Sequence, residues 1–454
     1  MSIREYTNTE LLRSSVYFSA FCLVFYLYAY PLFGLASRFY GGDELTMAYA
    51  ANMAGNACGY LAYSCLIRRG MRQKLIILGG VFCLLCFFVV IFFIKSFEVF
   101  LVTVFFAATL IGILGAIAHR SLAMLSYGSP ISGRVVGFAY AAALAVQFIV
   151  VHICASNEPA ALAAGLVIAG VAALIFSPPS NWISDDDTIV PSNYSAAPAK
   201  SAYAAAIASV AVLTLVYGLY DGVSSNLHAH GKLNVWDYPR LFSIVGILAA
   251  SWISDIKDRS YMSAAVLCFL TAGTAATLVL RSLATYALSQ SLQYLFSGAY
   301  VFFFTIVFMD LAPQSKEPAL WAGMGRAVHS AVLIPVIFAG HILFGNFGEI
   351  TIICISMAIF AVSIVLLVVR DRIMAANRET LTKNRSFDLF QTKYALTDRE
   401  TVIVKMLVEN DDTIDTIASE LDISKRTCQR DITAIYEKTC TQTRAGLLRV
   451  FHED

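Results

Sequence analysis

A short run near the C-terminus carries side chains that can hydrogen-bond to the bases of DNA. From Leu421 to Lys438 the chain reads LDISKRTCQRDITAIYEK. Ser424 is a residue type that caps the start of a helix. Basic and amide side chains on the first turns of such a helix are those that contact base edges in the major groove. The candidate DNA-contacting residues are Lys425, Arg426, Thr427, Gln429, Arg430, Thr433 and Lys438.

Short helices must position this run. The apolar spacing in LTDRETVIVKMLVEN predicts one helix, and Thr397 with Glu400 has the capping-box pattern. TIDTIASEL predicts a second helix, residues 422–424 the turn after it, and residues 444–451 a closing helix. The helix that follows the turn is expected to face the core with Ile432, Ile435 and Tyr436.

The tail is similar to the LuxR/NarL-type DNA-binding domain over about 60 residues. The matching residues are Leu396, Thr397, Arg399, Glu400, Leu407, Ile417, Ala418, Leu421, Ile423, Ser424, Thr427, Ile435, Tyr436, Lys438 and Arg444. The resemblance implies a four-helix, helix-turn-helix domain that binds promoter DNA as a homodimer through its last helix.

Several positions depart from that family's pattern. Its Val-Lys pair is Cys428-Gln429 here, its frequent His is Asp431, and its Gly after the first helix is Asn410. From Lys393 onward nine Lys/Arg face twelve Asp/Glu, a net charge of −3. Sequence-independent affinity for DNA should therefore be weak. The alternative is a small helical domain that binds protein.

The rest of the chain has the composition of a multi-pass membrane protein. The chain as a whole is 58% apolar and 14% charged, against about 45–50% and 25% in soluble domains. Because a membrane helix needs about 20 apolar residues, twelve stretches are predicted to span. They are 14–36, 45–67, 75–94, 99–117, 135–155, 160–176, 202–220, 241–253, 262–280, 286–309, 328–344 and 350–369.

The distribution of Lys and Arg predicts the orientation. An even number of spans places both termini on one side, and the loop RRGMRQK is rich in positive charge. Positive loops lie in the cytoplasm. We therefore expect cytoplasmic N- and C-termini and a location in the cell's inner membrane, in contact with lipid.

The twelve stretches divide into six plus six around a long Pro- and Ser-rich connection, and one charged loop holds Asp255 and Arg259. This layout resembles the major facilitator superfamily, although the corresponding first-half loop lacks the acidic residue. The expected fold is all-α. The expected parts are a six-helix half (1–176), a cytoplasmic loop (177–200), a second half (201–370), a juxtamembrane linker (371–392) and the DNA-binding domain (393–454).

Polar residues inside the predicted spans or close to their ends are candidate contacts for an unidentified small-molecule ligand, because they are costly to bury in lipid. They are Tyr26, Tyr30, Asn52, Asn56, His119, Arg120, Tyr217, Tyr220, Asp221, Gln290, Gln293, Tyr294, Arg326 and His329. The resemblance implies that several of them face a central cavity. Asp221 is the strongest candidate. The alternative for each is an interhelical hydrogen bond or an interfacial tyrosine.

Three functions fit these features. The favoured one is a one-component transcriptional regulator whose membrane part senses the ligand. The alternative is a transporter with a regulatory tail, and the weakest is a simple membrane anchor. His228 and His230 lack further ligands at metal-binding spacing. We expect no metal, no cofactor and no enzymatic activity.

Overall fold

The computed structural model describes residues 8–40, 42–154, 157–175, 198–229, 231, 234–257, 259–279, 283–409 and 412–453. Throughout these ranges the chain forms helices and connecting turns and no strand, as expected of an all-α protein. The predicted central loop, 177–200, lies outside the described residues except for its last three. Two compact units are present: residues 1–189 with 199–373, and residues 190–198 with 374–454.

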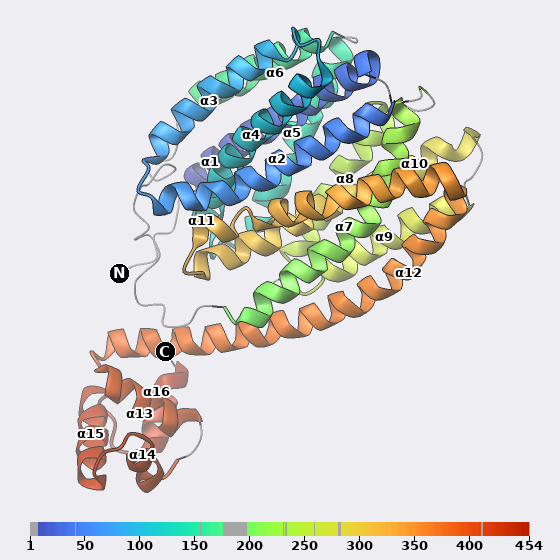
Figure 1. The fold of residues 1–454 in the computed structure, drawn as a ribbon. Coiled ribbons are helices and arrows are strands. Elements are labelled where there is room, and N and C mark those ends of the chain that lie inside the picture. The colour runs from blue at the N-terminus through green and yellow to red at the C-terminus, as the bar shows by residue number, and fades with distance from the viewer. Residues whose placement is uncertain are drawn as a thin grey trace. The chain divides into compact units, whose positions relative to one another are not determined.

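The first unit is a bundle of long apolar helices. Figure 1 shows α1–α6 in blue to cyan and the later helices in green to orange, with the helices of each group lying alongside one another. The first six are Asn8–Leu35 (α1), Gly42–Arg68 (α2), Gln73–Val90 (α3), Phe97–Ser126 (α4), Ser132–Ile153 (α5) and Glu158–Ile175 (α6). The later ones are Lys200–Ala229 (α7), Phe242–Ser254 (α8), Met262–Val279 (α9), Leu283–Leu311 (α10), the short Pro318–Trp321 (α11) and Met324–Lys393 (α12).

Seven helices within the described part of the chain are long and apolar enough to cross a membrane. Four more apolar helices are shorter: Glu158–Ala172, Tyr238–Ser254, Met262–Thr274 and Met324–Gly340. Helix α3 leaves large apolar side chains exposed, including Leu78 at 69% and Phe82 at 68%. A surface of that kind suits lipid rather than water. These helices indicate a multi-pass membrane protein. That it has twelve membrane spans stays a prediction.

Helix α12 contains the eleventh and twelfth predicted spans together. Val336 and Ile352 belong to one buried cluster with Leu219 of α7. In a straight helix, residues sixteen positions apart would be about 24 Å apart. The two apolar parts of α12 therefore double back on one another, as the orange ribbon in Figure 1 shows.

Helices α2 and α4 pack at close range. A side-chain carbon added to Gly59 would collide with the backbone carbonyl of Thr109, and one added to Gly112 with that of Asn56. Small residues permit such an approach between membrane helices. The contact fixes α2, which carries Tyr49 and Asn52.

The second unit is a small helical domain with its own core. Its helices are the end of α12, Asp398–Glu409 (α13), Ile414–Glu420 (α14), Lys425–Lys438 (α15) and Arg444–Glu453 (α16). The buried residues are Phe387, Phe390, Leu396, Ile403, Val404, Met406, Leu407, Ile417, Ala418, Cys428, Ile432, Ile435 and Leu447. Phe387 and Phe390 lie in the predicted linker 371–392, which is helical. The core of this unit therefore begins before residue 393.

Candidate ligand cavity and nucleic-acid interface

A cavity of about 180 Å³ lies inside the membrane unit. Helices α1, α2, α7, α10 and α12 contribute most of its walls. Ten of the fourteen predicted ligand residues line it: Tyr26, Asn52, Tyr217, Tyr220, Asp221, Gln290, Gln293, Tyr294, Arg326 and His329. Residues far apart in the sequence are thus gathered around one space.

The other four predicted residues do not line the cavity. They are Tyr30, Asn56, His119 and Arg120. Tyr30 packs edge-on against Trp236, with ring centroids 5.1 Å apart. The Asn56 amide donates to the backbone oxygen of Asn52 at 3.1 Å. His119 and Arg120 are buried in α4, where His119 Nδ1 lies 2.7 Å from the carbonyl of Gly115.

Asp221 accepts hydrogen bonds from two tyrosines. The hydroxyl of Tyr49 on α2 donates to Oδ2 at 2.7 Å, and that of Tyr217 donates to Oδ1 at 3.4 Å. Among the described residues Asp221 forms no ion pair. The bond from Tyr49 joins the two halves of the sequence across 172 positions. Tyr49 was not predicted, although it lies three residues before Asn52 and so on the same face of a helix.

Arg326 presents a buried positive charge to the cavity. The side chain is 7% exposed. Its guanidinium lies over the rings of Phe25 and Phe304, at 4.9 and 4.8 Å from their centroids. It also donates to the hydroxyl of Tyr140 at a long 3.4 Å. Within the described residues it forms no ion pair with a carboxylate.

A second guanidinium in the wall was not predicted. Arg240 precedes α8 and lies over the ring of Trp236, with 4.7 Å to the centroid. Its Nε donates to the Gln147 side chain at 3.3 Å. Both Arg240 and Trp236 come from the connection NVWDYPR, which the sequence alone places in a loop. No local pattern shows that such a loop covers a cavity.

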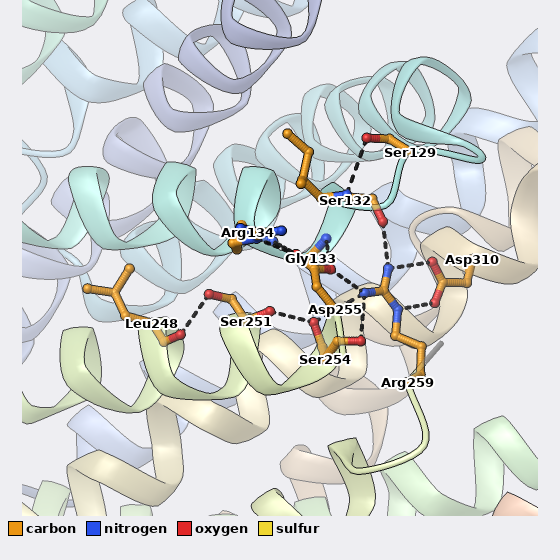
Figure 2. A network of polar contacts seen from close by, with 11 residues as sticks. Ser129, Ser132, Gly133, Arg134, Leu248, Ser251, Ser254, Asp255, Arg259 and Asp310 are labelled. Atoms are coloured by element: carbon orange, nitrogen blue, oxygen red, sulfur yellow. Dashed lines mark hydrogen bonds and ion pairs between the residues drawn. The ribbon is translucent and has the colours of Figure 1, made fainter. Parts of the chain in front are cut away.

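A polar network joins α5 with α10 and the loop after α8 (Figure 2). Arg259, after α8, binds both oxygens of Asp310 at the end of α10, at 2.9 and 3.1 Å. It also donates to Asp255 Oδ1 at 2.8 Å, to the hydroxyl of Ser132 on α5 at 2.7 Å, and to the carbonyl and hydroxyl oxygens of Ser254 at 3.2 Å. Asp255 and Arg259 are the residues of the charged loop named above.

Asp255 also caps α5. Its carboxylate accepts the backbone N–H groups of Gly133 at 2.8 Å and Arg134 at 2.9 Å. A carboxylate is favourable at a helix N-terminus, where backbone donors lack partners. Asp310 forms an ion pair with Arg259. Among the described residues, Asp221 is the carboxylate that lines the cavity.

The tail helices begin with side-chain caps. Thr397 and Glu400 exchange hydrogen bonds: the Thr397 N–H donates to Glu400 Oε2 at 2.7 Å, and the Glu400 N–H to Thr397 Oγ1 at 3.3 Å. Ser424 caps α15 by accepting the Thr427 N–H at 3.1 Å. Asp422, in the turn between α14 and α15, has φ 50°. A short polar residue adopts that conformation more readily than most.

Helix α15 separates its two faces clearly. Cys428, Ile432 and Ile435 are buried, and Tyr436 packs at the edge of the core. Exposed on the other face are Lys425, Arg426, Gln429, Arg430 and Thr433, with Thr427 half-buried.

Lys438 and Asp431 form ion pairs within the tail and so differ from the exposed residues of α15. Lys438, predicted to contact DNA, lies at the far end of α15 and donates to Glu400 at 2.6 Å and to the carbonyl of Ala395 at 3.2 Å. Asp431, where the LuxR-type pattern has His, pairs with Arg399 on α13 at 2.8 Å. Asn410 and His230 lie outside the described residues.

Glu400 accepts a hydrogen bond from Lys438 and also belongs to the capping box with Thr397. These contacts determine the protonation state of its carboxyl group. Burial raises the pKa of Glu400, but hydrogen bonds from Lys438 and from Thr397 outweigh it and hold the pKa below its ordinary value. The carboxylate is thus kept charged in the folded tail.

Comparison with known proteins identifies the fold of the membrane unit. No protein-family model matches the chain, and no curated protein matches it. The chain is similar in structure to the major facilitator superfamily proton:xylose symporter XylE bound to 6-bromo-6-deoxy-D-glucose. The TM-score is 0.52 and the identity 11%, over 78% of this chain and 94% of the symporter chain. At that identity the likeness shows a shared fold, that of a major facilitator transporter.

Proposed function

We propose that this protein is a membrane-embedded transcriptional regulator whose membrane unit binds a small molecule and whose tail binds promoter DNA. The observation that carries the proposal is the amphipathic α15, preceded by α14 and a tight turn. A polar and basic face left exposed on such a helix is what a recognition helix presents to the major groove.

The cavity supplies the sensing part of this proposal. It is lined by many aromatic rings and a few charged groups, which is the usual character of a small-molecule site. A ligand controls a protein only by binding one of its states more tightly than another. The walls come from both six-helix halves, so a ligand in contact with both would favour one arrangement of the halves.

Helix α12 carries residues of both the cavity wall and the tail. Arg326 and His329 near the start of α12 line the cavity, and Phe387 and Phe390 near its end belong to the core of the tail. The same helix thus contributes to the cavity wall and to the core of the tail. We propose that it transmits the ligand's effect to the DNA-binding unit, which acts as a homodimer.

Transport is the second candidate function. The similarity to a proton:xylose symporter supports it more directly than it supports regulation, because that similarity concerns a transporter fold. In this alternative the cavity carries its ligand across twelve spans, and the tail regulates the carrier by binding protein. Both candidates place the protein in the inner membrane with cytoplasmic termini.

Chromatin immunoprecipitation of the tagged full-length protein separates the two candidates. If α15 reads DNA, discrete genomic peaks should appear, and the Arg426→Ala, Arg430→Ala variant should lose them. Each contact of an arginine with a guanine is worth about 1–3 kcal/mol, so losing two should lower the affinity for the site at least about thirtyfold.

Arg69→Ala, Arg72→Ala is the matched control, because it removes two exposed arginines from the loop after α2 rather than from α15. It should keep the peaks. Uptake by the same cells is measured in parallel over candidate ligands. Uptake that depends on the protein, with no peaks under any ligand, would favour the transporter.

A further inference from the structure

The cavity contains a buried positive charge that has no ionic partner among the residues that the structure describes. Arg326 is 7% exposed, and its contacts are aromatic faces and one long hydrogen bond to Tyr140. Burying an unpaired charge is costly. Cation–π contacts offset part of that cost, but a carboxylate would satisfy the planar guanidinium with two parallel hydrogen bonds.

The charges along the cavity wall do not cancel. The lining includes two guanidiniums, Arg240 and Arg326, and one carboxylate, Asp221. Asp221 accepts hydrogen bonds from Tyr49 and Tyr217, and neither guanidinium forms an ion pair within the described part of the chain. Arg326 is buried, whereas Arg240 is half-buried. The charge that is most costly to leave unpaired is therefore that of Arg326, and a ligand with one negative charge could pair with it.

The size and lining of the cavity define the rest of the ligand. A cavity of about 180 Å³ is slightly larger than the roughly 150 Å³ cavity that accommodates one benzene ring. Phe25 and Tyr26 lie on the wall close to Arg326, and Tyr294 and Phe296 contribute further rings from α10. Flat apolar surfaces of this kind favour a flat apolar body.

We propose that the cavity binds a small aromatic monocarboxylate, with its carboxylate on the guanidinium of Arg326 and its ring among the aromatic side chains. This inference rests on the proposed function insofar as that function takes the cavity as the ligand site. A neutral sugar, by contrast, would leave the charge of Arg326 uncompensated.

Isothermal titration calorimetry on the purified full-length protein in detergent tests the inference. The probes are benzoate, phenylacetate and 3-phenylpropanoate, each beside its uncharged primary amide. At least one acid should bind, and its amide should bind at least about tenfold more weakly. Arg326→Met should weaken the acid at least about thirtyfold, the effect of removing one partner of a buried charge pair. Arg326→Lys keeps the charge, so it should lower the affinity for the acid less than Arg326→Met does.

Lys257→Met is the control, because it removes an exposed positive charge from the loop after α8. It should bind the acid as the wild type does. Three results would overturn the inference: no acid binds, the amides bind as tightly as the acids, or Arg326→Met binds the acid normally. If Arg326→Met fails to fold, the inference is tested by comparing the affinities of the wild-type protein for each acid and its amide.

The titration contains no DNA, so its outcome is separate from that of the immunoprecipitation. Acid binding without promoter occupancy would keep this inference and reject the regulator. Promoter occupancy without acid binding would reject this inference alone.

Discussion

At the scale of single residues, Gly133 shows how closely the two halves of the membrane unit meet. Its backbone N–H donates to Asp255, and a side-chain carbon at this position would collide with Ser254 and Asp255. Both obstacles belong to the buried network around Arg259, so neither can move without breaking hydrogen bonds. Only glycine fits there.

We therefore expect Gly133→Ala to lower the free energy of unfolding of the full-length protein by about 1–3 kcal/mol, the usual cost of overpacking. Thermal unfolding in detergent measures it. Gly79→Ala is the matched control, because a side-chain carbon added there meets nothing within 4 Å. That variant should be neutral or up to ~1 kcal/mol more stable, since alanine favours a helix. Equal melting temperatures for the two variants would contradict the packing described.

At the scale of elements, the tail is held by a bond between α13 and the end of α15. Lys438 donates to Glu400 at 2.6 Å, and Glu400 also closes the capping box with Thr397. Removing that carboxylate charge should therefore loosen two helices together.

The stability of the tail should consequently fall with acid. The pKa of Glu400 is lower in the folded state, although burial alone would raise it, because Lys438 and Thr397 hydrogen-bond to the carboxylate. Its contribution is fully present above the unfolded pKa of about 4.3, and it is lost as the pH falls through the folded pKa. Urea unfolding of residues 374–454 between pH 6 and pH 3 measures this loss.

Glu400→Gln is the matched variant, since glutamine can still accept the capping hydrogen bond without the charge. It should be less stable than the wild type at pH 6 and show a smaller loss on acidification. The fragment begins at Met374 because Phe387 and Phe390 belong to the core. An identical pH profile for the variant would refute the assigned role of Glu400.

At the scale of the whole molecule, the membrane unit depends on contacts between its two halves. Arg259 connects α5 with Asp310 of α10 and also pairs with Asp255, whose side chain is 4% exposed. Removing one partner of a buried ion pair typically costs about 3–5 kcal/mol, because the other charge stays buried.

Arg259→Gln should accordingly lower the melting temperature of the full-length protein by several degrees, because Asp255 and Asp310 both lose their cation. Lys257→Gln, on the same loop and exposed, should change it little. If both variants melted at the same temperature, the network could not be what joins the halves.

Local patterns in the sequence predicted the helical elements well. Apolar runs marked the long helices, Thr397 with Glu400 marked the start of α13, and Ser424 the start of α15. These features depend on residues a few positions apart, so the sequence by itself contains them. It also named ten residues that line the cavity, because polar groups inside apolar segments are rare.

Only the tertiary structure decided which of those polar groups meet. Tyr49 reaches Asp221 across 172 positions, and Asp255 reaches Gly133 across 122. It also showed that Arg326 has aromatic neighbours in place of an acidic one, and that Phe387 and Phe390 belong to the core of the tail. Hydrophobic periodicity determines which face of a helix is buried, whereas the partner of that face depends on how distant helices pack. The sequence therefore determined the helices and their caps, and the packing determined the cavity and its charge.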